Sequence, residues 1–470
     1  MKKIILYLVI ISFISPVLAQ NEADHWYFGI NAGMNFGPGT PVSTPGSLVT
    51  TEGTTTSSDS LGNLNFYSDG VSVWDKNGIV MPNGSGLYGN VSTTVSALAV
   101  PHPGNSNLHY LFTLDEATGI DGFCYSIVDM SLQSGNGDVT MKNVFIQNNL
   151  TEKMSAVKQL GTNNVWVTVH EWGTNAFYSY LVTPSGFQST PVISNAGMIH
   201  TIDPLEQNKY GQMKFNTCGT KLALAIGYLD TVEVLDFDPA TGIFSNPISL
   251  PLGDHVYGVE FSQDGQMLYT TRYNTGSGYA DLVQFDLSSG VPATILASMT
   301  TISTNTSGTN FYYAMQLGVN EKIYLSTSWS QFLGVIENPE IPGTGCNFNP
   351  TGLDLDPFFT GSSSALGLPA FIQSYFRGEV VCVAPNSLNE IPSSHFTLTP
   401  TVSADEFMLQ YENSDFPVTL QIFESTGRLV QEQKLSNTNS FKFGKNLAAG
   451  SYFVKATGAF SSGCFRIIRL

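Results

Sequence analysis

The sequence predicts an all-β protein in which a β-propeller of seven blades, closed by the N-terminal strand, is followed by a small Ig-like β-sandwich. Charged residues make up only 12% of the 470 residues, whereas glycine (45 residues) and aromatic residues (12%) are abundant, which favours short strands and tight turns. Repeated units of four short β-rich runs fill residues 22–383. After a Pro- and Ser-rich linker at 384–394, residues 395–470 form about seven short alternating runs, the pattern of a sandwich.

The propeller units are aligned by a glycine in the turn after the first strand of each unit. Tight hairpin turns favour glycine because the backbone there adopts positive φ. A sixth unit has Asn320-Glu321 at this position, and the most regular unit is 257–290. The five turn glycines are spaced 42, 57, 58 and 46 residues apart and are Gly62, Gly104, Gly161, Gly219 and Gly265.

A seventh unit, at 366–376, stops after one or two strands, while an aromatic strand at Trp26–Phe36 stands before the first repeat. A propeller that does not close its ring exposes an unpaired strand edge. We therefore predict that the strand Trp26–Phe36 pairs with 366–376 and closes the ring.

Residues 1–19 read as a secretory signal peptide. Lys2 and Lys3 precede an apolar run that is too short to span a bilayer, and the segment ends in Val17-Leu18-Ala19. Since no later apolar run approaches about 18 residues, no transmembrane segment is expected after cleavage, and the chain would reach the periplasm in soluble form.

The net charge of −18 is concentrated in the predicted propeller. Residues 22–383 carry 10 Lys and Arg against 30 Asp and Glu, whereas 384–470 carry 7 of each kind. Nucleic acids and anionic membrane surfaces are held mainly by Lys and Arg, so this distribution argues against both as partners.

The five cysteines have no C-x-x-C spacing and are odd in number, which argues against a disulfide framework or a zinc site. Cys346 and Cys382 lie in loop-like sequence and are the candidates for a pair. Free, partly buried thiols are the favoured interpretation for all five.

The last domain carries three motifs in order. Ser425–Val430 includes Gly427, a Leu-x-x-Gly-x-Tyr motif contains Leu447, Gly450 and Tyr452, and the chain ends on a basic-apolar run with Arg466 and Arg469. On these residues, 395–470 resembles the type A C-terminal sorting domain of type IX secretion cargo in the Bacteroidetes. The resemblance implies handling by the type IX secretion machinery, removal of the domain, and release from the cell or attachment to its surface.

The propeller region resembles a module of gliding-motility-associated surface proteins of the same bacteria. The resemblance covers about residues 25–376 and carries no enzymatic activity. It rests on Trp26-Tyr27-Phe28-Gly29, Phe66–Trp74, Met81-Pro82-Asn83-Gly84 and Gly367-Leu368-Pro369.

No familiar catalytic or metal-binding motif is present, and we expect neither catalytic residues nor a cofactor. The best ligand-binding candidate is His170-Glu171-Trp172, which ends a predicted strand near the axial channel, although a structural edge role is the favoured interpretation. Asp354 and Asp356 could ligate Ca²⁺, but a solvated acidic loop is favoured. His109, His200 and His255 are too scattered to predict a metal site.

The sequence leaves two functions open and does not decide whether the protein is an enzyme. The favoured one is a non-enzymatic protein that binds an extracellular glycan or protein; the other is a secreted hydrolase, such as a glycoside hydrolase, with an acid pair at the channel mouth. A sialidase is disfavoured because residues 22–383 contain only Arg272 and Arg377. Aromatic residues that could stack on sugars are Trp166, Trp172, Tyr312, Tyr313 and Trp329.

Overall fold

A computed structural model describes most of residues 21–469. The chain divides into two compact units between Cys382 and Val383. The predicted signal peptide and linker lie outside the described residues, and no helix in the described part is long and apolar enough to cross a membrane. The segments left out after residue 20 are 38–39, 117–118, 202–206, 275, 277, 309, 358–360, 379, 381, 383–395, 401, 412–416, 425–428, 436–439, 459–461 and 470.

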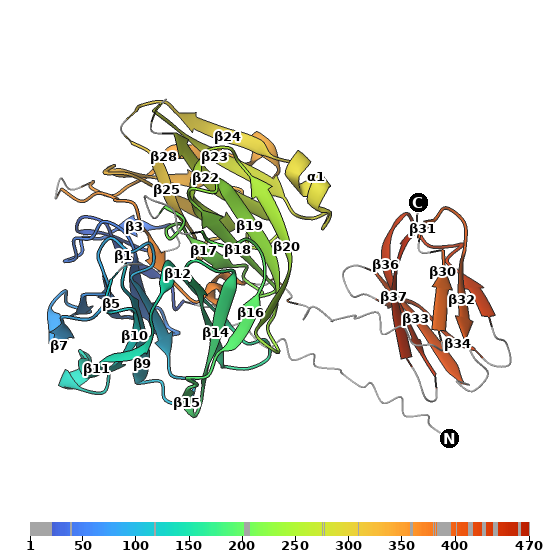
Figure 1. Ribbon diagram of the computed structural model, residues 1–470, viewed down its shortest axis with the longest axis horizontal. Coiled ribbons are helices and arrows are strands. Elements are labelled where there is room, and N and C mark those ends of the chain that lie inside the picture. The colour runs from blue at the N-terminus through green and yellow to red at the C-terminus, as the bar shows by residue number, and fades with distance from the viewer. Residues whose placement is uncertain are drawn as a thin grey trace, which may run out of the picture. The chain divides into compact units, whose positions relative to one another are not determined.

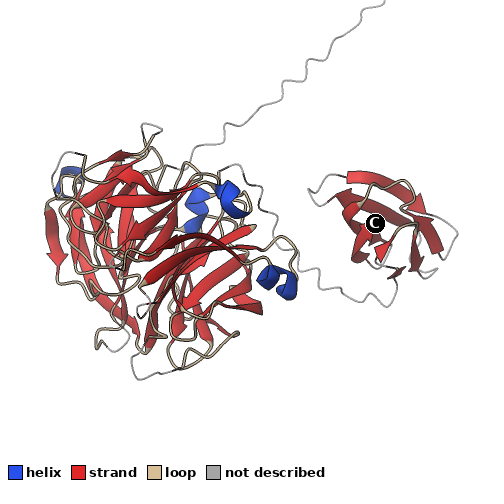
Figure 2. Ribbon diagram, turned by 90° about the horizontal axis from the view of Figure 1, so that it is seen from above, coloured by secondary structure: helices blue, strands red, loops and turns tan. Residues whose placement is uncertain are grey.

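Both units are built almost wholly from strands (Figure 2), and the described part of the first unit contains seven sheets (Figure 1). The first three sheets in chain order hold β1 (His25–Phe28), β2 (Ala32–Asn35) and β3 (Val42–Ser43); β4 (Thr54–Ser58), β5 (Leu64–Ser68), β6 (Ser72–Asp75) and β7 (Val80–Ser85), joined by β29 (Pro369–Ala370); and β8 (Ala97–Pro101), β9 (Leu108–Leu114), β10 (Phe123–Asp129) and β11 (Asp138–Gln147).

The other four sheets follow the same meander. They hold β12 (Leu150–Lys158), β13 (Val165–Glu171), β14 (Ala176–Thr183), β15 (Gly186–Phe187) and β16 (Val192–Asn195); β17 (Met213–Phe215), β18 (Lys221–Ile226), β19 (Thr231–Asp238) and β20 (Ile243–Pro251); β21 (His255–Phe261), β22 (Met267–Asn274), β23 (Tyr279–Asp286) and β24 (Thr300–Asn305); and β25 (Tyr312–Leu317), β26 (Ile323–Thr327), β27 (Phe332–Ile336) and β28 (Phe348–Asp354). The short helices are η1 (Gln133–Gly135), α1 (Pro292–Ala297), η2 (Gly343–Cys346) and η3 (Gln373–Phe376).

The seven sheets form a ring through contacts between the first strands of successive sheets. β1 contacts β4, β4 contacts β8, β12 contacts β17, and β21 contacts both β17 and β25. A hydrogen bond from Val95 N to Glu152 O (3.3 Å) bridges the third and fourth sheets. The ring closes where Trp26 packs on Tyr324, with ring centroids 5.5 Å apart. The predicted propeller of seven blades is confirmed.

Four of the five predicted turn glycines have the expected positive φ, whereas Gly104 lies in a turn without positive φ. Gly62, Gly161, Gly219 and Gly265 have positive φ between 64° and 84°. In the sixth repeat Glu321 takes this conformation, with φ of 66°, which is where the sequence lacks the glycine. A carboxylate residue therefore carries the strain that glycine avoids in the other turns.

The predicted strand pairing at the closure is wrong. β1 pairs with β2, and β2 with β3, so the N-terminal segment forms a whole blade of its own instead of completing the last one. The short strand β29 pairs in parallel with β4, and only a single bridge joins Ile30 to Ser363. The turn between β1 and β2 explains the hairpin, because Gly29 and Asn31 both adopt positive φ there.

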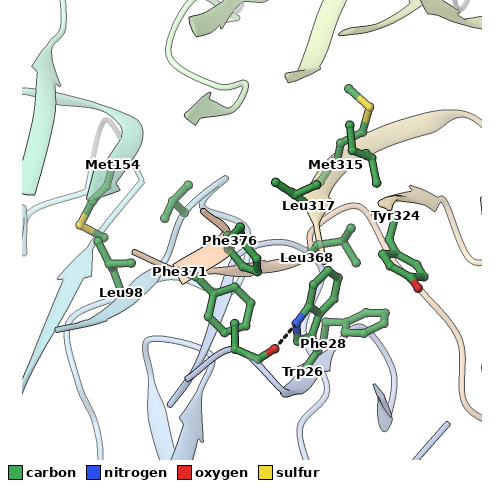
Figure 3. Packing of buried hydrophobic residues seen from close by; sticks show 14 of the residues in the cluster. Trp26, Phe28, Leu98, Met154, Met315, Leu317, Tyr324, Leu368, Phe371 and Phe376 are labelled. Carbon is green, nitrogen blue, oxygen red and sulfur yellow. Dashed lines mark hydrogen bonds between the residues drawn. The ribbon is translucent and has the colours of Figure 1, made fainter. Parts of the chain in front are cut away.

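The ring is closed by contacts between side chains rather than by strand pairing (Figure 3). The buried Trp26 ring lies 5.2 Å from Phe36 and 5.8 Å from Phe371, measured between ring centroids. Its Nε1 donates to the carbonyl of Ala23 at 2.9 Å, which satisfies its one polar group. The N-terminal blade is thereby packed against the returning segment that contains β29 and η3.

The end of the returning segment is held by a disulfide between Cys218 and Cys382, 164 residues apart in sequence. The candidate pair of Cys346 and Cys382 is therefore wrong, and so is the interpretation of all five cysteines as free. Cys124 and Cys346 are free and buried, as is typical of cysteines that pack as small apolar residues. Cys218 follows β17, so the bond fixes the chain end to the fifth blade.

The second unit is a sandwich of a three-stranded and a five-stranded sheet. The alternating sequence places Leu398, Leu409, Val418 and Val454 in a common core between the sheets. The first sheet holds β30 (Phe396–Thr399), β32 (Phe407–Tyr411) and β35 (Ser440–Phe443), and the second β31 (Val402–Ser403), β37 (Ser462–Arg469), β36 (Gly450–Thr457), β33 (Val418–Glu424) and β34 (Leu429–Leu435).

Replacing Trp26 by alanine tests the closure. We expect Trp26→Ala to lower the free energy of unfolding by about 3–5 kcal/mol, because it opens a cavity where two ends of the ring meet. The matched control is Trp329→Ala, whose side chain is exposed and whose loss should change stability little. Chemical denaturation of both variants measures the effect, and equal midpoints for the two would contradict this account of the closure.

Candidate functional site

The axis of the propeller is filled by buried polar side chains from the first strands of several blades. Lys214 on β17 forms an ion pair of 3.4 Å with Glu260 on β21 and also donates to Gln316 on β25. Glu260 Oε2 accepts from Leu317 N at 3.1 Å. Gln212 accepts from Met315 N at 2.8 Å and donates to its carbonyl at 3.1 Å, so one amide ties two blades together.

A second polar layer contains a buried acid pair. Glu52 precedes β4 and accepts a 2.8 Å hydrogen bond from the Tyr257 hydroxyl. Glu152 on β12 accepts from Thr94 N and Oγ1, each at 3.1 Å, and lies 3.9 Å from Lys209 Nζ. Burial and then the nearby Glu152 charge raise the pKa of Glu52 to about 8, and burial raises the pKa of Glu152 as well.

Lys153 completes this layer. Its Nζ donates to the carbonyls of Lys209 (3.1 Å) and Tyr210, and burial lowers its pKa to about 7. Between the polar layers and the returning segment, the described residues leave a cavity of only about 10 Å³, lined in part by Gln212, Leu368 and Phe371. A space of that size admits no substrate, and neither acid lines it. Glu52 and Glu152 are themselves buried, with 8% and 4% of their surface exposed.

The predicted ligand-binding triplet does not present three side chains to one site. His170 is fully buried and stacks on His200 with ring centroids 3.7 Å apart, and burial lowers its pKa to about 3. Trp172 is buried in the turn that follows β13. Only Glu171 is half-exposed, and its carboxylate accepts from the Thr174 hydroxyl at 3.0 Å.

Among the five aromatic residues proposed to stack on sugars, Trp329 is 57% exposed, whereas Trp166, Trp172 and Tyr312 are buried. Trp329 has φ of 55°, an uncommon conformation for a bulky residue that turns its side chain outward. Sequence reasoning missed Tyr228, which is 50% exposed and stacks on His255 with ring centroids 6.3 Å apart. The sequence signal that could have identified Tyr228 is its position in the turn Gly227–Asp230, because turn residues lie at the surface.

These two exposed aromatic residues lie on the same face of the propeller. Tyr228 lies between β18 and β19, and Trp329 between β26 and β27, so both occupy turns from the second to the third strand of a blade. In a meander sheet such turns lie at the end where the first strand begins. We call this end the upper face, and the opposite end, with the turns at Gly161 and Gly219, the lower face.

The lower face is occupied at its centre by η3. Ser374 Oγ accepts from Lys158 N at 2.7 Å and the carbonyl of Phe376 accepts from Gln263 at 3.1 Å, which places η3 between the ends of β12 and β21. Hollows of about 370, 460 and 320 Å³ border η3. The first of these, which we call the cationic pocket, is lined by Lys158, Asn163, Thr217, Ser374 and Arg377, among others.

The proposed Ca²⁺ ligands are engaged in loop hydrogen bonds. Asp354 Oδ1 accepts from Gln331 at 2.9 Å, and Asp356 Oδ2 accepts from Gly361 N at 3.0 Å. Within the described ranges, no group of three or more His, Cys, Asp or Glu is arranged to hold a metal ion.

The sorting motif residues shape the sandwich. Leu447 packs against its core, and the buried Tyr452 donates its hydroxyl to the carbonyl of Ala448 at 3.0 Å, which fixes the corner before β36. Gly450 begins β36 with φ of 154°. Arg469 Nη1 lies 3.4 Å from the carbonyl of Ser403. Gly427 and the Arg466 side chain lie outside the described residues.

The two units define a modular protein in which a propeller precedes a small C-terminal sandwich. Residues 400–468 of the sandwich match the family described as the secretion system C-terminal sorting domain. The predicted sorting domain is confirmed, and it implies export by type IX secretion to the cell surface or the outside. No curated protein matches the sequence.

Similar solved structures include Kuenenia stuttgartiensis hydrazine synthase, at 13% identity and a TM-score of 0.32, covering 51% of this chain and 62% of that one. The periplasmic gluconolactonase PpgL of Pseudomonas aeruginosa matches at 12% identity and a TM-score of 0.37, over 81% of this chain and 98% of that one. The β-propeller domain of Cps50 (Swd1) from Myceliophteria thermophila matches at 12% identity and a TM-score of 0.31, over 80% of this chain and 97% of that one. Scores this low say nothing about the function of this chain.

Replacing Glu52 by glutamine tests the buried acid pair. Because the pKa of Glu52 rises from 4.5 to about 8, the folded protein keeps a proton that the unfolded chain loses, so stability should fall as pH rises through this window. As the pH is raised from 5 to 8, we expect the melting temperature of Glu52→Gln to fall less than that of the natural protein. Glu116→Gln, on an exposed loop, is the control; an equal decline in Glu52→Gln and the natural protein would disprove the claim.

Proposed function

We propose that the protein is a secreted or surface-displayed propeller that binds an extracellular glycan or protein without catalysis. Its N-terminal signal peptide would direct it to the periplasm, and the sorting domain at 400–468 then hands it to the type IX machinery. The resemblance to gliding-motility-associated surface proteins favours display at the cell surface. The binding surface that we favour is the upper face, which carries Tyr228 and Trp329.

One observation carries the non-enzymatic part of this proposal: both members of the acid pair are buried. The carboxylates of Glu52 and Glu152 accept hydrogen bonds from buried protein groups, and the two residues are only 8% and 4% exposed. General acid and base groups must reach the reacting atoms of a substrate, and these two do not. Exposed aromatic rings, in contrast, stack on the apolar faces of sugars and anchor protein partners.

A secreted hydrolase is the second candidate, and the acid pair is the observation that favours it. Glu52 and Glu152 come from different blades, and burial raises the pKa of Glu52 to about 8, as the general acid of a glycosidase requires. This function would need the buried acid pair to become accessible to a substrate. Product release from a polysaccharide by the natural protein, abolished in Glu52→Gln, would favour the hydrolase over the binding protein.

Binding is tested on a glycan array with the protein purified from culture supernatant. We expect retention of a glycan without turnover, and a loss of about tenfold or more in affinity for Trp329→Ala, since base and sugar stacking contacts are worth about 1–3 kcal/mol. Glu171→Gln tests the predicted triplet on the same array. Trp26→Phe, a buried change, is the control for general effects on folding. If Trp329→Ala and Tyr228→Ala both bind the glycan with unchanged affinity, the upper face is not the binding surface.

Export is tested separately by deleting residues 395–470. We expect the truncated protein to accumulate in the periplasm, because the sorting domain is the part that the type IX machinery recognises. Cell fractionation and immunoblotting locate the protein. The control is Trp329→Ala, which changes the proposed ligand site and should leave export unchanged. Normal appearance of the truncated protein outside the cell would contradict the export route.

A further inference from the structure

The propeller is acidic, and nearly all of its few cations are neutralised or occupied within the fold. Residues 22–383 contain 10 Lys and Arg. Five of these side chains form ion pairs, and three more donate to backbone carbonyls. The ion-paired residues are Lys209, Lys214, Lys221, Arg272 and Lys322, and the other three are Lys76, Lys142 and Lys153.

The two remaining cations lie together. Among the described residues, Lys158 and Arg377 have no carboxylate or carbonyl partner for their charged groups, and both line the cationic pocket on the lower face. Lys158 Nζ instead lies 5.1 Å from the centre of the Tyr375 ring, and both side chains are half-exposed. In a domain with three acids for each base, two unpaired cations in one hollow form a local reversal of charge.

The rest of the pocket adds donors and no opposing charge. None of the residues that line it is acidic, and its neutral part includes Gln159, Asn163 and Thr217. Its volume is about 370 Å³, within the range of small-ligand sites. The disulfide between Cys218 and Cys382 holds the chain five residues beyond Arg377, so this arginine is presented from an anchored segment.

We propose that the cationic pocket binds the acidic group, a carboxylate or a sulfate, of an extracellular glycan. Arg377 supplies a planar fork of donors that matches two oxygens of such a group, and Lys158 supplies a second positive charge. The polar amide and hydroxyl groups of the lining suit the hydroxyls of a sugar ring. This inference rests on the proposed binding function and names the class of ligand as an acidic glycan. It places the contact with the acidic group on the lower face, opposite the face that carries Trp329.

Isothermal titration calorimetry with the protein purified from culture supernatant tests the proposal. The probes are a uronic-acid oligosaccharide, a sulfated oligosaccharide, a neutral oligosaccharide of the same length and a short polyglutamate peptide. We expect one or both acidic oligosaccharides to bind, with affinity falling as salt is raised, and the neutral one not to bind at this pocket. The uronic-acid and sulfated probes distinguish the two acidic groups.

Substitution locates the site. Arg377→Gln and Lys158→Gln should each weaken binding of the acidic oligosaccharide by about 10- to 100-fold, since hydrogen bonds to charged groups are worth about 1.5–3 kcal/mol. Arg377→Lys should recover only part of the loss, because the fork is missing. Lys76→Gln, on a different blade, is the matched control, and unchanged melting temperatures show that the variants fold.

Two results would overturn the inference. If Arg377→Gln and Lys158→Gln both bind acidic oligosaccharides as tightly as the natural protein, the cationic pocket is not the binding site. If polyglutamate binds as tightly as the acidic oligosaccharides or more tightly, the pocket is a site for acidic peptides instead. If Trp329→Ala abolishes glycan binding while both pocket variants bind normally, the proposed function stands and this inference fails. Absence of binding to every glycan probe would count against both.

Discussion

Closure of the ring is the constraint on which the rest of this structure depends. A propeller blade cannot bury both of its faces alone, so a gap anywhere in the ring exposes apolar surface on two blades at once. Here Trp26 of the N-terminal hairpin packs on the last blade, and the segment at 366–376 returns to the axis, where η3 occupies the centre of the lower face. The lower-face hollows border this segment.

Much of the fold could be predicted from the sequence because it is repetitive. Turn glycines, alternating strands and the C-terminal motifs report local geometry, so the blades and the sandwich could be predicted. Glu321 shows how strong this constraint is, since it adopts the glycine-like conformation without being glycine. Asp264 and Asp286 show the same local control, because their carboxylates accept hydrogen bonds from Gln266 N and Ser288 N two residues further along the chain.

The closure and the candidate site could not be predicted, because both depend on contacts between residues far apart in sequence. No local pattern indicates that Cys218 meets Cys382 or that Glu52 lies beside Glu152. The triplet at His170 became a ligand-binding candidate because it ends a strand, although a structural edge role was favoured; the burial of His170 depends on stacking against His200, thirty residues further along the chain. Conversely, nothing in the local sequence distinguishes Lys158 and Arg377. They stand out only because, of the other eight cations in residues 22–383, five form ion pairs and three donate to backbone carbonyls.

The measurement that tests the closed ring most directly is the melting temperature of the propeller with and without reductant. Because the Cys218–Cys382 bond closes a loop of 164 residues, its reduction should cost on the order of 2–4 kcal/mol. We predict that reductant lowers the melting temperature of the natural protein to that of Cys382→Ser and leaves the variant unchanged. A melting temperature of the natural protein that is insensitive to reductant would contradict the anchored return of the chain to the axis.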